Sequence, residues 1–377
     1  MRNRLVLAIP LFVALTVSAY ALPRFASQMN LSCQSCHVNP LGGGMRNAFG
    51  QSFGRDSLAV KNWAKDFNLD DFSPKITDYM SYGADVRFLA FYQSKTNPGT
   101  SSSSFFPMQT DLYFNFTVSK KISLYLNPAF GPYNRLEAFG IAKVLPANGY
   151  FKFGRFTPPY GLRLDDHTSF VRQSTPFRNN MGQQTGIELG LNPGPVTIMG
   201  ALTNGIRGDL DAATSKAVYG KLEAHGALGP LNLLGGISSY NDASGLEKIN
   251  LLGGYGAVSL CENLTLMGDI ERIQGNSSQL SVNSDINQRN TLGTQVKQLA
   301  LLVEADYLLV NGLDLKFMYD FFDPNTDLKS GTAARYSGGV EFMPMSGVEV
   351  RPMFRYTKDT IIGRNTTDLQ VLFHLYL

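Results

Sequence analysis

The sequence lacks the features that define several protein classes. After the first 25 positions it has no apolar run of eighteen or more residues, which excludes a helical membrane protein even though 44% of its 377 residues are hydrophobic. Only 17% of the residues are charged, and 25 Phe and 17 Tyr exclude an intrinsically disordered chain. The formal net charge is only +3, so the composition gives no indication of a nucleic-acid partner.

The N-terminus is predicted to be a signal peptide over residues 1–21. Arg2 and Arg4 form its basic start, residues 5–17 its apolar stretch, and residues 19–21 (AYA) a small-residue cleavage site. The alternative is an uncleaved anchor helix, which the short apolar stretch disfavours. We therefore expect an exported protein whose mature chain begins near residue 22.

Cysteine is scarce, and the three residues Cys33, Cys36 and Cys261 fit no disulfide framework. The first two stand in the pattern CQSCH, which ends in His37 and is typical of covalent c-type haem attachment. Both thiols then reach the vinyl groups of one porphyrin while the adjacent imidazole binds the iron. The alternatives are a thioredoxin-like redox pair, without its βαβ context here, and a zinc half-site, without a second pair of ligands. One haem c is the predicted cofactor, and Cys261 is interpreted as an isolated thiol.

Residues 22–75 are predicted to form a small monohaem cytochrome c-like segment. The segment contains a triple glycine at 42–44 and weak helical periodicity over 47–67. So few residues bury little surface, and a covalent haem would supply the missing core. The glycines either let the backbone approach the porphyrin or only turn the chain.

From residue 76 to residue 377 the hydrophobic pattern has period two. Over 108–119, for example, apolar residues alternate with mostly polar ones, which predicts a half-polar strand about ten residues long. In other strands the charged residues fall on the face opposite the apolar one: Asp314, Lys316, Asp320, Glu349, Arg351 and Arg355.

We predict sixteen strands, joined alternately by tight turns and by long polar loops such as 94–106, 158–185 and 275–296. The predicted strands are 78–93, 107–119, 122–130, 135–145, 150–157, 186–192, 196–204, 215–228, 231–240, 249–260, 264–274, 297–310, 313–323, 334–344, 348–358 and 366–377.

An even strand count with short turns on one side predicts an all-β fold, a 16-stranded antiparallel transmembrane β-barrel in the bacterial outer membrane. Such a sheet must close, because an open edge leaves backbone groups unpaired in lipid. The short turns and both termini then face the periplasm. The alternative is a soluble all-β sandwich, which would bury the charged faces or expose the aromatic ones to water.

Residues 23–28 (PRFASQ), one CxxCH pattern within the first forty residues and sixteen predicted strands resemble the fused monohaem cytochrome c–porin family of outer-membrane electron-transfer proteins, which includes iron-oxidising electron conduits. A barrel segment, residues 154–164 (GRFTPPYGLRL) with 170–172 (FVR), resembles phosphate-selective-type porins.

The cytochrome–porin resemblance implies an electron conduit that passes electrons between the periplasm and an extracellular donor or acceptor, iron among them. Its implied partners are outer-membrane lipid, periplasmic cytochromes or other electron carriers, and an extracellular metal or redox partner. Whether the protein also has iron oxidase or reductase activity stays open. The alternative function is a solute-selective porin in which the haem domain is a plug or a structural element.

Two features of the interior are left open by the sequence. In sixteen-stranded porins the third long loop commonly folds into the lumen; the resemblance implies that 158–185 either constricts the pore or stays outside, and its charged residues are Arg163, Asp165, Asp166, His167, Arg172 and Arg178. The sixth ligand of the haem iron also has several candidates, which are Met45, Met29, His374, His225 and His167.

Overall fold

The computed structural model describes residues 23–60, 72–96, 101–130, 135–176, 182–207, 214–243, 248–276, 295–328 and 331–377. The predicted leader, residues 61–71 of the predicted haem segment, and Arg178 lie outside the described residues.

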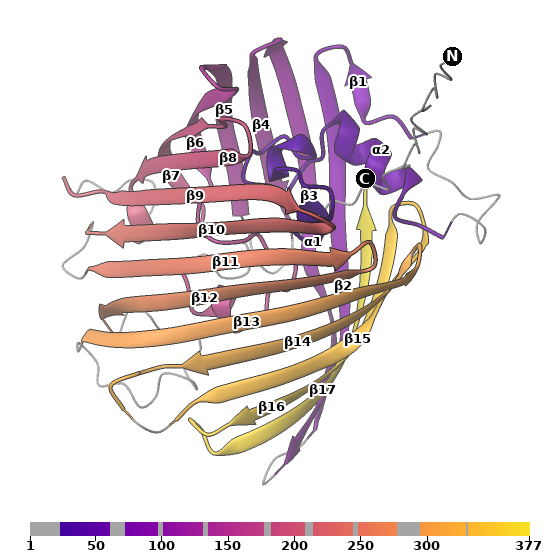
Figure 1. Cartoon of the computed structure of the whole chain (residues 1–377), viewed down its shortest axis with the longest axis vertical. Helices are drawn as coiled ribbons and strands as arrows, with labels where there is room; N and C mark the ends of the chain where they lie inside the picture. The colour runs from indigo at the N-terminus through magenta and orange to yellow at the C-terminus, as the bar shows by residue number, and fades with distance from the viewer. Residues whose placement is uncertain are drawn as a thin grey trace, which may run out of the picture.

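Sixteen long strands form one closed antiparallel barrel (Figure 1). Each strand pairs with its neighbour in the chain, and the last pairs with the first, from Asn365 opposite Thr96 to Tyr376 opposite Asp85. The strands are β2 (Met80–Thr96), β3 (Ser102–Ser119), β4 (Ile122–Ala129), β5 (Arg135–Leu145), β6 (Gly149–Phe156), β7 (Gln184–Leu191), β8 (Val196–Thr203), β9 (Ala217–Leu228), β10 (Leu231–Asp242), β11 (Ile249–Cys261), β12 (Leu264–Asn276), β13 (Gln295–Val310), β14 (Leu313–Asp323), β15 (Ala333–Met345), β16 (Val348–Asp359) and β17 (Arg364–Tyr376).

The predicted all-β fold and its sixteen barrel strands are confirmed. Strands β5 and β14 match the predicted ranges residue for residue, and the other ends differ by a few residues. One short strand was not predicted: β1 (Lys75–Thr77) pairs only with the start of β2 and is not part of the closed ring.

The two faces of the barrel wall differ in polarity as the alternation predicts. On β14, Phe317 is 56% exposed on the outside, whereas its neighbour Lys316 is 2% exposed and faces the interior. On β17, Leu369, Phe373 and Leu375 are exposed on the outer face. The exterior is therefore apolar and the interior charged, which is the arrangement of a barrel surrounded by lipid. Within the described ranges, no helix has the length and apolar character needed to cross a membrane.

The first described segment lies inside the barrel, near the end that carries the tight turns. It contains α1 (Pro23–Gln28), the short 3-10 helix η1 (Cys33–Ser35) and α2 (Ala48–Asp56). Helix α1 packs against β10, β11 and β12 (Figure 1). Its Gln28 side chain donates to Thr265 Oγ1 at 2.9 Å. At the tight-turn end, the Val60 N–H donates to the carbonyl of Met343 at 3.1 Å. We refer to residues 23–60 as the plug.

The long loop between β6 and β7 also folds into the lumen. It carries the short helix α3 (Phe170–Gln173), which contacts β12, β13 and β14. Phe170 and Val171 are buried there. The Phe170 N–H donates to Asp320 Oδ1 at 3.0 Å. Of the two predicted placements of this loop, the structure has the inward one. A further 3-10 turn, η3 (Gly205–Arg207), follows β8.

Candidate functional site

The two plug cysteines and the histidine that follows them share one turn of backbone. The N–H groups of Cys36 and His37 both donate to the carbonyl of Cys33 at 3.2 Å, which closes η1. Both thiols are free. The CxxCH pattern is therefore presented on a single compact turn, the local geometry that attachment to one porphyrin requires.

Asn47 fixes this turn against α2. Its backbone N–H donates to Cys36 O at 2.9 Å, and its side-chain Nδ2 donates to Ser35 O at 2.9 Å. Its Oδ1 accepts from the Gly50 N–H at 3.0 Å and so caps the helix. A Cβ at Gly50 would lie 2.1 Å from Cys36 O, so the close approach of α2 to the CxxCH turn requires glycine.

The triple glycine makes a tight left-handed turn beside the cysteines. Gly42, Gly43 and Gly44 have φ of +87°, +67° and +63°, which favour glycine strongly. Added Cβ atoms would meet Cys33, Arg163 and Tyr125, respectively, at distances of 2.5 to 3.1 Å. The glycines are thus needed to turn the chain under neighbouring side chains.

A cavity with an empty volume of about 1140 Å³ lies between the plug, the inward loop and the barrel wall. Cys33, Cys36 and His37 line it from the plug. Four arginines also line it, and they are Arg46, Arg87, Arg135 and Arg163.

The arginines come from different parts of the chain. On β2, Arg87 Nε lies 3.1 Å from Asp85 Oδ1. Arg135 on β5 pairs with Asp111. Arg163 on the inward loop lies 4.0 Å from Glu137. Arg46 on the plug stacks over the ring of Tyr376 at 4.2 Å. Three of the four arginines are thus already paired with carboxylates, and the charge around the cavity is mixed.

Burial controls the chemistry of the two thiols. Burial, with a contribution from Glu223, raises the pKa of the Cys33 thiol to about 12, and burial also raises the pKa of Cys36. Both groups are therefore neutral thiols at neutral pH in the haem-free chain.

The donor set fits a c-type haem. Two neutral thiols and an imidazole lie on one turn at the edge of the cavity, whose lining also contains four arginines, three carboxylates and several apolar side chains. Arginines there can pair with the two propionates of the porphyrin, which are anionic.

The structure separates the five candidates for the sixth ligand. Met29 and His374 line the same cavity as the cysteines. Met45 does not line the cavity and is buried in an apolar cluster with Tyr113 and Tyr125. His225 does not line the cavity either, and its Nδ1 lies 3.0 Å from Asn30 Oδ1. His167 is buried on the inward loop, where burial together with Arg87 and Arg135 lowers its pKa well below the usual value.

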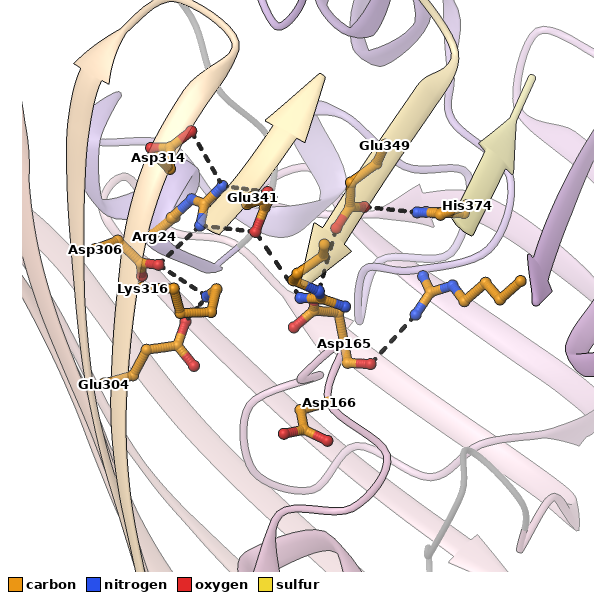
Figure 2. A network of polar contacts seen from close by, with 12 residues as sticks. Arg24, Asp165, Asp166, Glu304, Asp306, Asp314, Lys316, Glu341, Glu349 and His374 are labelled. Atoms are coloured by element: carbon orange, nitrogen blue, oxygen red, sulfur yellow. Dashed lines mark hydrogen bonds and ion pairs between the residues drawn. The ribbon is translucent and has the colours of Figure 1, made fainter. Parts of the chain in front are cut away.

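A network of buried charges joins the plug and the inward loop to the wall (Figure 2). Arg24 of the plug donates to Asp306 at 2.8 Å and to Glu341 at 2.5 Å. Lys316 lies 2.8 Å from Asp306, and Arg351 pairs with Asp165 of the inward loop. The alternation along the strands predicts their inward charges, but burial of Arg24 was not predicted, since a basic residue after a cleavage site carries no signal of burial.

Further ion pairs hold the inward loop. Arg355 Nη2 lies 2.7 Å from Asp166 Oδ2. Burial alone would raise the pKa of Asp166, but Arg355 and Arg335 outweigh it and hold this pKa below its usual range. Arg172 is buried near Arg163, and burial with that neighbour lowers its pKa to about 10. Asp165, Asp166 and Arg172 are thus engaged with the interior, and the loop is part of the lumen filling.

No protein-family model matches the chain, and no curated protein is similar to it in sequence. Solved structures are similar in fold. An anion-selective porin from Comamonas acidovorans matches with a TM-score of 0.57 and 11% identity, over 79% of this chain and 99% of that one. OprB of Pseudomonas putida matches with a TM-score of 0.62 and 9% identity, over 79% and 94%. The channel DcaP of Acinetobacter baumannii matches with a TM-score of 0.54 and 12% identity, over 79% and 97%.

The chain therefore has the fold of an outer-membrane porin, a closed antiparallel barrel with a loop inside the lumen. Identities of 9 to 12% support the fold alone.

Proposed function

We propose that this protein is an outer-membrane electron conduit in which one c-type haem, attached to Cys33 and Cys36 and bound by His37, passes electrons between the periplasm and an extracellular donor or acceptor. The observation that carries the proposal is the CxxCH turn at a cavity inside a closed barrel. A plug that only blocked a pore would need neither the paired thiols nor the cavity.

The apolar exterior supports an outer-membrane location, because it would be stable only in lipid. The partner on the tight-turn side would be a periplasmic cytochrome or another electron carrier. On the long-loop side it would be an extracellular metal, iron included, or another redox partner.

The residues of this chain would have three roles. Each thiol of Cys33 and Cys36 would add across one vinyl group, with the thiol hydrogen passing to the vinyl carbon, so attachment would need no oxidant. His37 would bind the iron. The arginines of the cavity would pair with the propionates. When bound, the haem supplies one-electron redox chemistry.

Aromatic packing supports transfer along the lumen. One contiguous buried cluster includes Tyr150, beside the tight turn between β5 and β6, and Tyr240, at the long-loop end of β10. Tyr113 belongs to the same cluster and also lines the cavity. Tyr125 and Phe139 stack within it at 4.8 Å. The cluster therefore offers closely packed side chains from the cavity to the far end of the barrel.

The test uses the full-length protein in liposomes that enclose a redox dye. An external reductant should reduce the dye with the native protein and not with Cys33→Ala/Cys36→Ala, whereas Cys261→Ala should behave as the native protein. A native protein that binds no covalent haem, or that moves no electrons when loaded, would reject the proposal.

A second candidate is a solute-selective porin in which residues 23–60 act as a plug or structural element. The fold similarity to porins, one of them described as anion-selective, by itself favours this candidate over the first. The same liposomes separate the two, because a porin gives solute-dependent conductance that survives Cys33→Ala/Cys36→Ala, with no electron transfer to the dye.

A further inference from the structure

His374 is the imidazole of the barrel wall that reaches the cavity of the CxxCH turn. It lies near the end of β17, its side chain is buried, and it lines the cavity together with Cys33, Cys36 and His37. His37 belongs to the plug, whereas His374 belongs to the barrel wall.

His374 stands between two carboxylates of the barrel wall, one at each ring nitrogen. Its Nδ1 lies 2.8 Å from Glu349 Oε2 on β16, directly opposite in the strand register. Ligating histidines commonly donate one ring N–H to a carboxylate, which fixes the tautomer and leaves the other nitrogen for the metal. The other nitrogen, Nε2, is buried and has only an ion-pair contact, 3.2 Å from Asp85 Oδ1.

The carboxylate behind His374 is itself held in place. Arg351 Nε lies 3.2 Å from Glu349 Oε1, and Arg351 also pairs with Asp165 of the inward loop (Figure 2). On the other side of β17, Arg87 of β2 stands opposite His374 in register. The imidazole is thus oriented by a network of ion pairs on the wall.

A short chain of contacts joins the two histidines. His37 forms an isolated antiparallel bridge with Arg46. The Arg46 guanidinium stacks over Tyr376 at 4.2 Å, and the Tyr376 ring centroid lies 5.1 Å from that of His374. Plug and wall therefore meet at this corner of the cavity.

Met29, the other candidate that lines the cavity, is engaged differently. It packs against an apolar cluster that contains Phe25, Phe53 and Leu308. A methionine in such a cluster has an ordinary packing role, whereas the His374 ring is oriented by a hydrogen bond to Glu349.

We propose that, in the haem-bearing protein of the proposed function, His374 Nε2 is the second axial ligand of the iron, so that one metal ion joins the plug to the barrel wall. Nε2 would leave its contact with Asp85, passing any proton it carries to that carboxylate, and bind the iron through its lone pair, while Nδ1 keeps its hydrogen bond to Glu349. Two imidazole ligands predict a lower potential than an imidazole and a thioether would give.

The first measurement is the ferric spectrum of the full-length, haem-loaded native protein. We expect a low-spin haem without the sulfur-to-iron charge-transfer band. His374→Gly should convert it to a high-spin form, and added imidazole should restore the low-spin spectrum. The matched control His225→Gly removes an imidazole outside the cavity and should change nothing.

His374→Met gives a positive signal at the same position, because the sulfur-to-iron band should appear only if residue 374 faces the iron. A sulfur-to-iron band in the native protein that is lost in Met29→Leu would overturn the inference, as would an unchanged low-spin spectrum in His374→Gly. Either outcome would overturn the role of His374 without contradicting the proposed electron-conduit function. A native protein without covalent haem would instead reject the proposed function, so the two results can be told apart. The native spectrum decides between imidazole and thioether even if neither His374 variant folds.

Discussion

Arg24 of the plug and Glu341 of β15 lie 317 positions apart in the chain, yet their side chains meet at 2.5 Å in the barrel interior. Both are buried, and Asp306 accepts a second hydrogen bond from the same guanidinium. Helix α1 is therefore fixed to the wall by charge as well as by packing.

Removing this guanidinium should loosen the plug. Arg24→Gln leaves Glu341 with Arg351 at 3.8 Å and Asp306 with Lys316 at 2.8 Å as remaining cations, so it should cost less than the about 3–5 kcal/mol of a buried charge left wholly unpaired, while it removes the ion pairs that join α1 to the wall. We expect faster protease cleavage within residues 23–60 of the purified barrel. Arg55→Gln removes an arginine whose pair with Asp56 is exposed, and cleavage at the native rate is expected there. If the native protein, Arg24→Gln and Arg55→Gln were all cleaved by the protease at the same rate, the proposed role of Arg24 in holding the plug would be wrong.

The haem and the barrel should be separable. Cys33→Ala/Cys36→Ala should abolish the covalent haem stain and leave a heat-modifiable barrel on a gel, because the closed strand ring does not include the plug. Cys261 lies at the exposed end of β11, so Cys261→Ala should keep the stain. A double variant that still stains, or one in which no barrel forms, would refute the separation.

Two glycines of α2 should respond in opposite ways to alanine. Alanine favours a helix over glycine by up to ~1 kcal/mol. Gly54→Ala should therefore be neutral or stabilising, since its nearest neighbour is at 3.6 Å. Gly50→Ala places a methyl group 2.1 Å from the Cys36 carbonyl and should displace the CxxCH turn. Haem stain per barrel is the measurement, and we expect it to fall in Gly50→Ala alone. Equal staining of both variants would show that the close approach is unnecessary.

The Cys33 thiol should react slowly in the haem-free, refolded chain. With a pKa of about 12, only about one thiol in ten thousand is ionised at pH 8. Alkylation of Cys33 should accelerate nearly tenfold per pH unit up to pH 11, while the exposed Cys261 already reacts at pH 8. Mass spectrometry of the alkylated chain follows both sites. A Cys33 that reacts as fast as Cys261 at pH 8 would mean that the turn is open to solvent.

The inward loop should stay docked in moderately acidic solution. Because the pKa of Asp166 is lowered in the folded protein by Arg355 and Arg335, its contribution is fully present above the unfolded pKa of about 3.9 and is lost as the pH falls through the lower folded value. Bilayer conductance should therefore be constant between pH 7 and pH 5.

Neutralising the loop carboxylate should release the loop at neutral pH. In Asp166→Asn the ion pair with Arg355 is gone, and we expect conductance to rise. Asp327→Asn, which removes an exposed pair with Lys297, is the control and should conduct as the native protein does. If the conductance of the native protein already changed between pH 7 and pH 5, the ion pair between Asp166 and Arg355 would not be what holds the inward loop in place.

The sequence by itself determined the strands and the attachment motif. Strand alternation is a local property with a period of two residues, so each strand could be placed from its own residues, as β5 and β14 show. The pattern CQSCH is equally local, because the chemistry acts within one turn.

Only the tertiary structure decided what meets in the lumen. Which of Met29, Met45, His167, His225 and His374 reaches the cavity depends on the strand register and on how the plug enters the ring. The partners of Arg24 lie some 300 positions away, and a buried ion pair leaves no periodic trace in the sequence. A buried charge is tolerated only where the fold brings an opposite charge within hydrogen-bond distance. Which charges meet in this way depends on closure of the barrel rather than on any one segment.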